Sequence, residues 1–282
     1  MAGWPIVRIR IDMAYDGTDF SGWATQPGLR TVQETLESAL ATSLRTPAVR
    51  VTCAGRTDAG VHARAQVGHA DLDEGVVDGY VGRAKEPPLE ALTRRLNGIL
   101  PLDVRVHRVS VAPAGFDARF SALWRRYAYR ISDSAATVDP LMRHQVLAWQ
   151  RPLDLDRMNE AAALLLGEHD FAAFCRRREG ATTIRTLLEL SWSRDDLGLA
   201  VAHVRADAFC HNMVRSLVGC MLAVGDGRRR PDFAREVLLG LVRDGRVTVA
   251  QPRGLTLEQV AYPPDAGLAQ RASDVRKVRS LD

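Results

Sequence analysis

Residues 6 to 15 alternate between apolar and polar side chains. The apolar positions of this run are Val7, Ile9, Ile11, Met13 and Tyr15. A period of two is the pattern of a β-strand with one buried and one wetted face, as antiparallel sheets use it. The sequence therefore predicts a strand over residues 6 to 15.

A helical period follows this strand. Val32, Leu36 and Leu40 recur four residues apart, which places them on one face of an α-helix. Thr31 precedes this run and Glu34 stands three residues after it, the spacing of a capping box. We therefore predict a helix over residues 31 to 43 that begins at a Thr31 cap.

The remaining patterns predict strands and helices mixed along the whole chain. In the first half we expect strands near 49–54, 66–71, 103–111 and 126–132 and a helix near 89–99. In the second half we expect helices near 154–166, 209–225 and 233–243 and strands near 184–194 and 199–206. Similar content in both halves favours an α+β fold, which we divide into residues 1–115 and 116–264.

Two segments show no periodic pattern. The segment from Asp71 to Pro88 is rich in glycine and acidic residues and ends in Pro87-Pro88, so we expect an exposed loop there. Residues 265–282 are charged and lack periodicity, so we expect a mobile tail.

Composition restricts the class of protein. A chain of 282 residues with 46% hydrophobic content can bury a sizeable core. No signal peptide and no stretch of about 18 uncharged apolar residues stands out, so we expect a cytoplasmic protein without a membrane span. The four cysteines include no C-x-x-C pair, and we expect them to be reduced, buried hydrophobes. His62, His69 and Cys53 do not have the spacing of a zinc site.

The charge suits a polyanionic partner without proving one. The formal net charge is +4 and the pI is about 9.1. Lys85 and Lys277 are the two lysines, which leaves 38 − 2 = 36 arginines. The planar arginine side chain suits phosphate contacts and stacking on bases, although a coding bias toward arginine would explain the same ratio.

The segment Gly55 to His62 isolates one carboxylate among small, turn-forming residues. Its sequence is Gly-Arg-Thr-Asp-Ala-Gly-Val-His, and it follows a strand-like run, so Asp58 is our candidate nucleophile at a strand end. Arg56 can hold the Asp58 carboxylate ionised if both lie on one side of the loop, or it can bind a phosphate. An isolated segment of this kind is more often an ordinary turn.

Other segments follow this one in a characteristic order. They are Tyr15-Asp16-Gly17, Phe20-Ser21-Gly22-Trp23, Thr31-Val32-Gln33-Glu34, Leu96-Asn97, Leu100-Pro101, Phe116 to Ala122, Arg125 to Tyr129, His169-Asp170-Phe171, Ala208-Phe209, Met213-Val214-Arg215, Pro252 and Gly254-Leu255. Together with the Asp58 segment, this series resembles the bacterial tRNA pseudouridine synthase A family, over roughly residues 6 to 263. Ala24 and Ala70 depart from the family pattern, which has glutamine and commonly phenylalanine there.

The resemblance implies a fold and a reaction. The fold would be a pseudouridine synthase fold, in which two ferredoxin-like halves form one mostly antiparallel sheet with an RNA-binding cleft between them. The enzyme would isomerise uridine to pseudouridine at consecutive positions of the tRNA anticodon stem-loop. Asp58 would be the nucleophile, and the reaction would need neither a metal nor another cofactor. The family is usually a homodimer that binds one tRNA across both subunits.

The resemblance also assigns roles in the second half. Tyr127 matches the active-site tyrosine of the family and would lie under the extruded base; on its own pattern it would be a core aromatic residue of a strand. Arg215 lies in an apolar helical run, where an unpaired charge is costly. In the family this arginine reaches toward the nucleophile's loop, so Arg215 and Arg56 would set the charge of Asp58. The alternative for Arg215 is a side chain that extends to solvent from a helix edge.

Three groups of arginines could bind the tRNA backbone. They are Arg125-Arg126, Arg176-Arg177-Arg178 and Arg228-Arg229-Arg230. We favour Arg125 or Arg126 because they adjoin Tyr127, although such clusters are usually solvated surface charge. Two other functions stay open from the sequence: a catalytically silent RNA-binding or RNA-folding module, and a pseudouridine synthase that acts on a different RNA or nucleotide.

Overall fold

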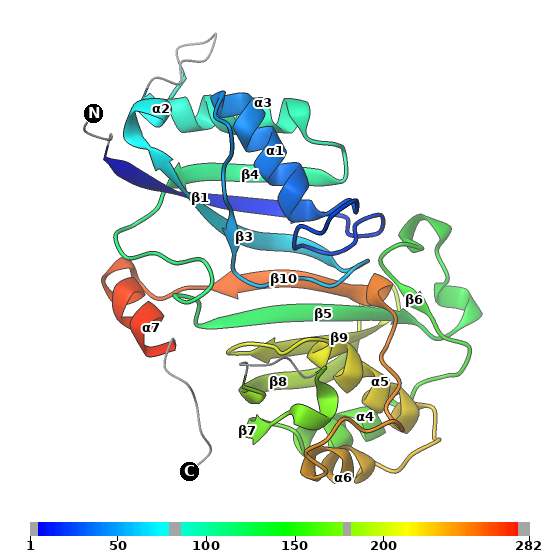
Figure 1. Cartoon of the computed structure of the whole chain (residues 1–282). Helices are drawn as coiled ribbons and strands as arrows, with labels where there is room; N and C mark the ends of the chain where they lie inside the picture. Colours follow the sequence, from blue (N-terminus) through cyan, green and yellow to red (C-terminus); the bar gives the residue numbers. More distant parts are fainter. Residues whose placement is uncertain (1–4, 79–85, 177–181, 276–282) are drawn as a thin grey trace. The chain divides into compact units, whose positions relative to one another are not determined.

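The computed structural model describes residues 5–78, 86–176 and 182–275 (Figure 1). The chain divides into two compact units. The first unit ends at Leu123 and resumes at Gln259, and the second runs from Trp124 to Glu258. The boundary therefore lies after Leu123 rather than after residue 115, and the chain returns to the first unit near its end.

The first unit has the β-α-β-β-α-β order of a ferredoxin-like fold. Its sheet has the strand order β4-β1-β3, and β2 pairs with β3. Both pairings of β1 are antiparallel, with Ile9 opposite Ala70 on β3 and Val111 on β4. The elements are β1 (Ile6–Tyr15), α1 (Val32–Leu44), β2 (Thr52–Cys53), β3 (His62–Asp73), α2 (Glu74–Asp78), α3 (Pro88–Ile99) and β4 (Val104–Val111).

Apolar and polar residues alternate in the sequence of β1, and the apolar ones are those that the structure buries more deeply. Ile9, Ile11 and Met13 are fully buried, and α1 and α3 lie together on one side of the three-stranded sheet (Figure 1). The strand over residues 6 to 15 is therefore confirmed. The helix after it is also confirmed, but the predicted cap is wrong: the buried Thr31 hydroxyl makes no cap bond and has no hydrogen-bond partner among the described residues.

The second unit repeats the β-α-β-β-α-β order with additions. Its strands follow the order β10-β5-β9-β8-β7, and β6 pairs with β5 in parallel. The elements are β5 (Trp124–Ser132), β6 (Leu147–Ala148), α4 (Leu155–Ala163), β7 (Gly167–Asp170), β8 (Ile184–Arg194), β9 (Ala200–Ala206), α5 (Met213–Gly225), α6 (Phe233–Leu239) and β10 (Leu255–Ala261). Short 3₁₀ turns cover Ala135–Thr137, Pro140–Met142, Ala172–Phe174 and Pro252–Gly254, and a further one covers Asp265–Gly267 in the first unit. The predicted α+β class with two ferredoxin-like halves is confirmed.

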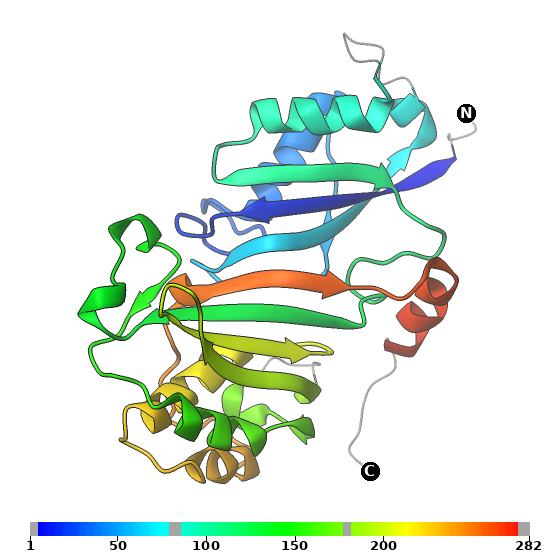
Figure 2. The same cartoon turned by 180° about the vertical axis from the view of Figure 1, so that it is seen from behind.

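Two expectations for the less regular segments are wrong. Residues 71–73 continue β3, and α2 follows them, so no loop begins at Asp71; residues 79–85 lie outside the described residues. After Pro264 the chain forms α7 (Leu268–Val275), which buries Leu268 and Ala272 in the first unit (Figure 2). Its apolar residues are too few for a clear period in the sequence. Residues 276–282 lie outside the described residues.

The cysteines are not all unpaired. Cys175 and Cys210 form a disulfide with their Cα atoms 5.8 Å apart, although 35 residues separate them in the sequence. The pair joins the end of the Ala172–Phe174 turn to the segment before α5, and only the fold brings these positions together. Cys53 and Cys220 are buried free thiols, and burial raises the pKa of each to about 12. None of the helices in the described ranges is long and apolar enough to cross a membrane.

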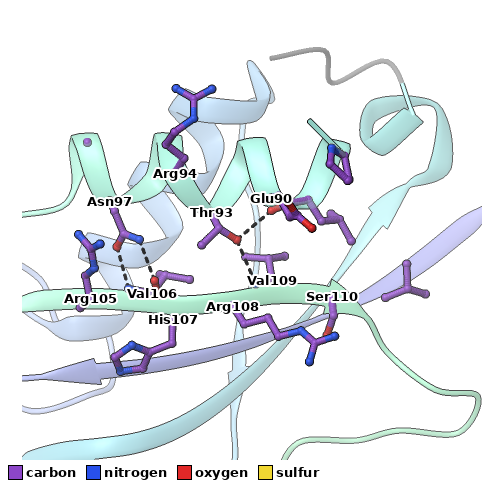
Figure 3. A pocket seen from close by; sticks show the side chains of 14 residues that line it. Glu90, Thr93, Arg94, Asn97, Arg105, Val106, His107, Arg108, Val109 and Ser110 are labelled. Atoms are coloured by element: carbon purple, nitrogen blue, oxygen red, sulfur yellow. Dashed lines mark hydrogen bonds between the residues drawn. The ribbon is translucent and has the colours of Figure 1, made fainter. Parts of the chain in front are cut away.

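Asparagine side chains bond strand backbone groups that no neighbouring strand pairs, in both units. Asn97 on α3 donates to the carbonyl of Val106 at 2.7 Å and accepts from its N–H at 2.9 Å (Figure 3). Asn159 on α4 makes the same pair of bonds with Trp192 on β8, at 3.0 and 2.8 Å. Each amide takes the place of a neighbouring strand, so these edge groups are not left as templates for further pairing. This role accounts for the Leu96-Asn97 motif.

We expect Asn97→Ala to lower the free energy of unfolding by about 1–3 kcal/mol, because it leaves two backbone groups of the buried Val106 without partners. Urea unfolding of the purified variant measures this. Arg95→Ala changes an exposed residue of the same helix and should stay within about 0.5 kcal/mol of wild type. Equal stabilities of the two variants would contradict the role of Asn97.

The segment after β4 packs back on the sheet through His69. Nδ1 of the buried His69 accepts a hydrogen bond from the N–H of Ala118 at 3.0 Å. Arg10 lies over the rings of Phe116 and Tyr262, and the Tyr262 hydroxyl donates to the carbonyl of Ala118 at 2.7 Å. The motif from Phe116 to Ala122 therefore folds against β3 and the returning end of the chain.

Stability is expected to fall as the pH drops below about 6.5. Burial lowers the pKa of His69 from the usual histidine value of about 6.5, and the nearby Arg8 lowers it further, against Asp117 and Asp71. Because the folded-state pKa is the lower one, the stabilisation is complete above 6.5 and is lost as the unfolded chain takes up a proton first. Urea unfolding at about pH 7.5 and about pH 5.5 should show a smaller pH effect in His69→Gln than in wild type. An equal effect in both proteins would assign the acid sensitivity to other groups.

Candidate active site

Asp58 lies in a short loop between β2 and β3 of the first unit. The loop turns tightly after Asp58, where the N–H of Val61 donates to the carbonyl of Asp58 at 3.2 Å. Gly60 has a φ of +74°, a conformation that glycine adopts without steric cost. Asp58 is half-buried, whereas Thr57 beside it is 5% exposed. The loop thus places the half-buried Asp58 directly after the buried Thr57.

Thr57 belongs to a buried hydrogen-bonded network with Tyr15 and Gln66. The Tyr15 hydroxyl lies 2.8 Å from the Thr57 hydroxyl. Nε2 of Gln66, which is fully buried, donates to the Tyr15 hydroxyl at 3.2 Å and to the carbonyl of Gly55 at 2.9 Å. The network holds the loop at Gly55 and at Thr57, and so restricts where Asp58 lies.

The opening motif of the chain packs directly on this loop. The N–H of Trp23 donates to the carbonyl of Thr57 at 3.0 Å, and the N–H of Gly60 donates to the carbonyl of Phe20 at 3.2 Å. A Cβ on Gly17 would lie 2.0 Å from the carbonyl oxygen of Val61, which no side chain could tolerate. The motifs from Tyr15 to Trp23 and from Gly55 to His62 are therefore two sides of one structure.

Arg56 does not hold Asp58 in this structure. Its side chain is exposed and forms no hydrogen bond or ion pair with any residue in the described ranges. The geometry therefore favours the alternative role for Arg56, the binding of an anion such as a phosphate.

Tyr127 belongs to the second unit, on β5. It is 7% exposed and meets Phe209 edge to face, with ring centroids 5.2 Å apart and an interplanar angle of 89°. Phe209 is half-buried in the segment between β9 and α5. Aromatic contacts of this geometry stabilise both rings, so Tyr127 has a fixed orientation.

Arg125 and Arg126 lie on opposite faces of β5, because side chains alternate along a strand. Arg125 shares the face of Tyr127 but is only 7% exposed, and its Nη1 donates to the carbonyl of Asp207 at 2.7 Å. Arg126 is exposed on the other face. Arg125 is therefore engaged within the second unit, and Arg126 is the exposed one of the pair. The expectation that one of them binds the tRNA backbone stays a prediction.

Arg215 lies in the first turn of α5. Every other residue of this helix is buried. Its Nε donates to the carbonyl of Ala250 at 2.7 Å, and its own carbonyl accepts from the N–H of Ala250 at 3.0 Å. A Cβ on Gly219 would lie 1.6 Å from the carbonyl oxygen of Thr248, so helix and loop are in direct contact. The backbone of residues 248–250 thus fixes the position of the Arg215 side chain. This arrangement favours a positioned charge over a side chain that extends into solvent.

Comparisons with known proteins show the family of this chain. A family model described as tRNA pseudouridine synthase matches residues 161–263. The chain is 60% identical to tRNA pseudouridine synthase A of Streptomyces griseus, over 98% of this chain and 95% of that protein. It is 57% identical to the protein of that name from Frankia casuarinae, over 97% and 96%, and 51% identical to the one from Mycobacterium leprae, over 97% and 96%.

The chain belongs to the tRNA pseudouridine synthase A family. The motifs that suggested this family have structural roles that the sequence did not reveal. Gln66 and Tyr15 form the base of the Asp58 loop, and Phe209 packs on Tyr127. No spacing rule links Tyr15, Gln66 and Gly55, since the fold alone brings them together.

Other candidates of the sequence have structural partners within this family fold. The two histidines of the rejected zinc set each accept a backbone N–H, His62 from Gly17 at 3.1 Å and His69 from Ala118. No group of three potential metal ligands occurs among the described residues. Arg228 bonds Asp226, and Arg229 lies over the ring of Phe233. Arg177 and Arg178 lie outside the described residues.

Proposed function

We propose that this protein is a tRNA pseudouridine synthase that isomerises uridine in the anticodon stem-loop, with Asp58 as the nucleophile. The observation that carries the proposal is the Asp58 loop. Asp58 is half-buried at a strand end, in a loop that Tyr15 and Gln66 bond at Thr57 and Gly55, and the chain is 60% identical to a protein named tRNA pseudouridine synthase A. Fixing a reactive group in this way lowers the entropic part of a reaction barrier.

The reaction needs few chemical groups. The bond between ribose C1′ and uracil N1 breaks, the detached uracil turns, and C1′ bonds to C5, which releases its proton while N1 regains one. The atoms of uridine are conserved, and nothing is oxidised or reduced. A carboxylate that forms and then releases a covalent bond is sufficient for such a step. Attack on the ribose and addition to the base both use the Asp58 carboxylate.

The other candidate residues have supporting roles in this proposal. A uridine inside a stem must leave the stack before it can react, and an aromatic ring is a natural surface for an extruded base. Tyr127, fixed by Phe209, is that surface. Arg215 supplies positive charge that keeps the nucleophile ionised, and Arg56 binds an RNA phosphate. Arg126 is the remaining candidate for a backbone contact on β5.

The proposal includes the biological setting that the family resemblance implies. The enzyme works in the cytoplasm as a homodimer that binds one tRNA. It acts without an added metal or nucleotide, because proton movement and one carboxylate complete the reaction.

The test is a direct assay. Purified protein is incubated in a chelator with an unmodified tRNA transcript that has uridines in the anticodon arm, and pseudouridine is mapped by chemical modification and primer extension. Product at those uridines is the expected result. Tight tRNA binding without product would favour a silent RNA-binding module, and product only with another RNA would favour a different substrate; either would overturn the proposal.

A further inference from the structure

A groove of about 940 Å³ in the first unit is lined by residues of α3 and β4, away from the Asp58 loop. Its lining mixes apolar and polar residues, and Arg94, Asn97, Arg105, His107 and Arg108 are among the polar ones. Asn97 and Thr93 reach from the helix to the strand, and His107 and Arg108 project from the strand away from the helix (Figure 3).

The groove is not a site for the addition of another strand to β4, because side chains of α3 already bond the β4 backbone. Asn97 already bonds both the N–H and the carbonyl of Val106, and the Thr93 hydroxyl accepts from the N–H of Val109 at 3.1 Å. Addition of a strand needs a row of unpaired backbone groups. The occupant is therefore bound through side chains.

The exposed side chains on the β4 side of the groove are predominantly cationic. Arg105, His107 and Arg108 are exposed and form no hydrogen bond or ion pair with any residue in the described ranges. Arg94 is neutralised by Glu86, and Glu90 is the acidic residue of the lining. The β4 side of the groove thus has an excess of positive charge.

A bulge in β4 concentrates this charge. Asp12 on β1 is opposite Arg108, whereas the next residue, Met13, is opposite Val106. His107 is therefore the extra residue, and a bulge changes the direction of neighbouring side chains. As a result His107 and Arg108 are both exposed, although they are adjacent in the sequence.

The cationic strand begins next to the structure that supports Asp58. Val104 at the start of β4 is opposite Tyr15 on β1, and the Tyr15 hydroxyl contacts Thr57 beside Asp58. From there β4 runs for 8 residues, which is about 26 Å. An RNA with its reactive uridine at Asp58 could follow β4 away from the reaction site.

We propose that this groove binds the phosphate backbone of tRNA outside the modified anticodon arm, through Arg105, His107 and Arg108. The inference rests on the proposed function, because that function supplies the polyanionic substrate. The inference extends the proposed function by separating two parts of substrate binding. The Asp58 loop binds the uridine, and the groove binds the body of the tRNA. Phosphate contacts of this kind give affinity and register without reading the sequence.

The test compares binding of full-length tRNA and of an isolated anticodon stem-loop by wild type and by the double variant Arg105→Gln, Arg108→Gln. Kd is measured over a range of salt concentrations. Each lost phosphate contact lowers the slope of log Kd against log salt by about 1. We expect the double variant to bind full-length tRNA about tenfold more weakly, with a slope lower by about 2, and to bind the isolated arm like wild type.

The control removes the same charge elsewhere. Arg235 and Arg243 in the second unit are exposed, and Arg235→Gln, Arg243→Gln should bind both RNAs like wild type. Equal weakening by both double variants would show an effect of net charge alone, and an unchanged slope in the groove variant would show no contact; both results overturn the proposal. A changed oligomeric mass with an unchanged slope would assign the groove to a second copy of the chain. If wild type binds tRNA but forms no pseudouridine, the proposed function fails while the slope still tests the groove.

Discussion

Asp58→Asn is expected to reduce the rate of pseudouridine formation by at least about 10³-fold, because an amide has nearly the shape of the carboxylate but is a very poor nucleophile. The loop itself should survive the change. Its contacts at Gly55, Thr57 and Gly60 come from backbone groups and from Tyr15 and Gln66. We therefore expect an unchanged unfolding temperature and a Kd for tRNA within about threefold of wild type.

Single-turnover assays with enzyme in excess over tRNA measure this effect free of product release. The matched control is Asp73→Asn, the same change at an exposed residue at the end of β3, which should react like wild type. Product from Asp58→Asn at more than about a tenth of the wild-type rate would contradict a nucleophilic role for Asp58. A lowered unfolding temperature would instead show that its carboxylate helps to hold the loop.

The sequence predicted the elements in which buried residues recur at a fixed interval. β1 alternates because one face packs under α1 and α3 and the other does not, so Ile9, Ile11 and Met13 mark its boundaries. The same reasoning gave α3, β8 and β9 within a residue or two. These elements each bury a whole face, and local sequence is then sufficient.

Elements whose position depends on distant contacts were missed. α7 is short and buries only Leu268 and Ala272, and the disulfide joins residues 35 positions apart. Thr31 stands at the right residue for a cap, yet its hydroxyl makes no cap bond. In each case the outcome depends on packing between segments, which propensity does not describe.

The candidate site shows the same division. Asp58 could be chosen because a carboxylate among glycines follows a strand, which is local information. Arg56 and Arg125 were assigned by their distance along the chain from Asp58 and Tyr127. The structure gives them different surroundings: Arg56 is exposed, and Arg125 is buried against the carbonyl of Asp207. Side-chain direction, which a count of residues does not provide, separates these cases.

Gln66 bonds the loop that contains Asp58. It stands on β3, is fully buried, and donates both to the Tyr15 hydroxyl and to the carbonyl of Gly55. A buried amide needs its partners, and here the partners are Tyr15 at the end of β1 and Gly55 in the loop itself. Gln66 is therefore a positioning residue for Asp58.

Gln66→Leu should lower kcat by about 10- to 100-fold with little change in KM, because a displacement of about 1 Å at a reacting group costs about this much. Tyr15→Phe should cost less, about 3- to 10-fold, since Gln66 keeps its bond to Gly55. The double variant should be no slower than Gln66→Leu alone, because both changes break one network. Gln270→Leu, the same change at an exposed residue of α7, is the control and should react like wild type.

These assays are run well below the unfolding temperature of each variant, and kcat is expressed per folded molecule, so a loss of stability alone does not enter. Fully additive effects of Tyr15→Phe and Gln66→Leu would contradict a shared network. A rise in KM at constant kcat would mean that Gln66 acts on RNA binding instead of on Asp58. The split between kcat and KM thus distinguishes positioning of the nucleophile from support of the fold, since both buried residues lie beneath the loop and neither needs to touch the RNA.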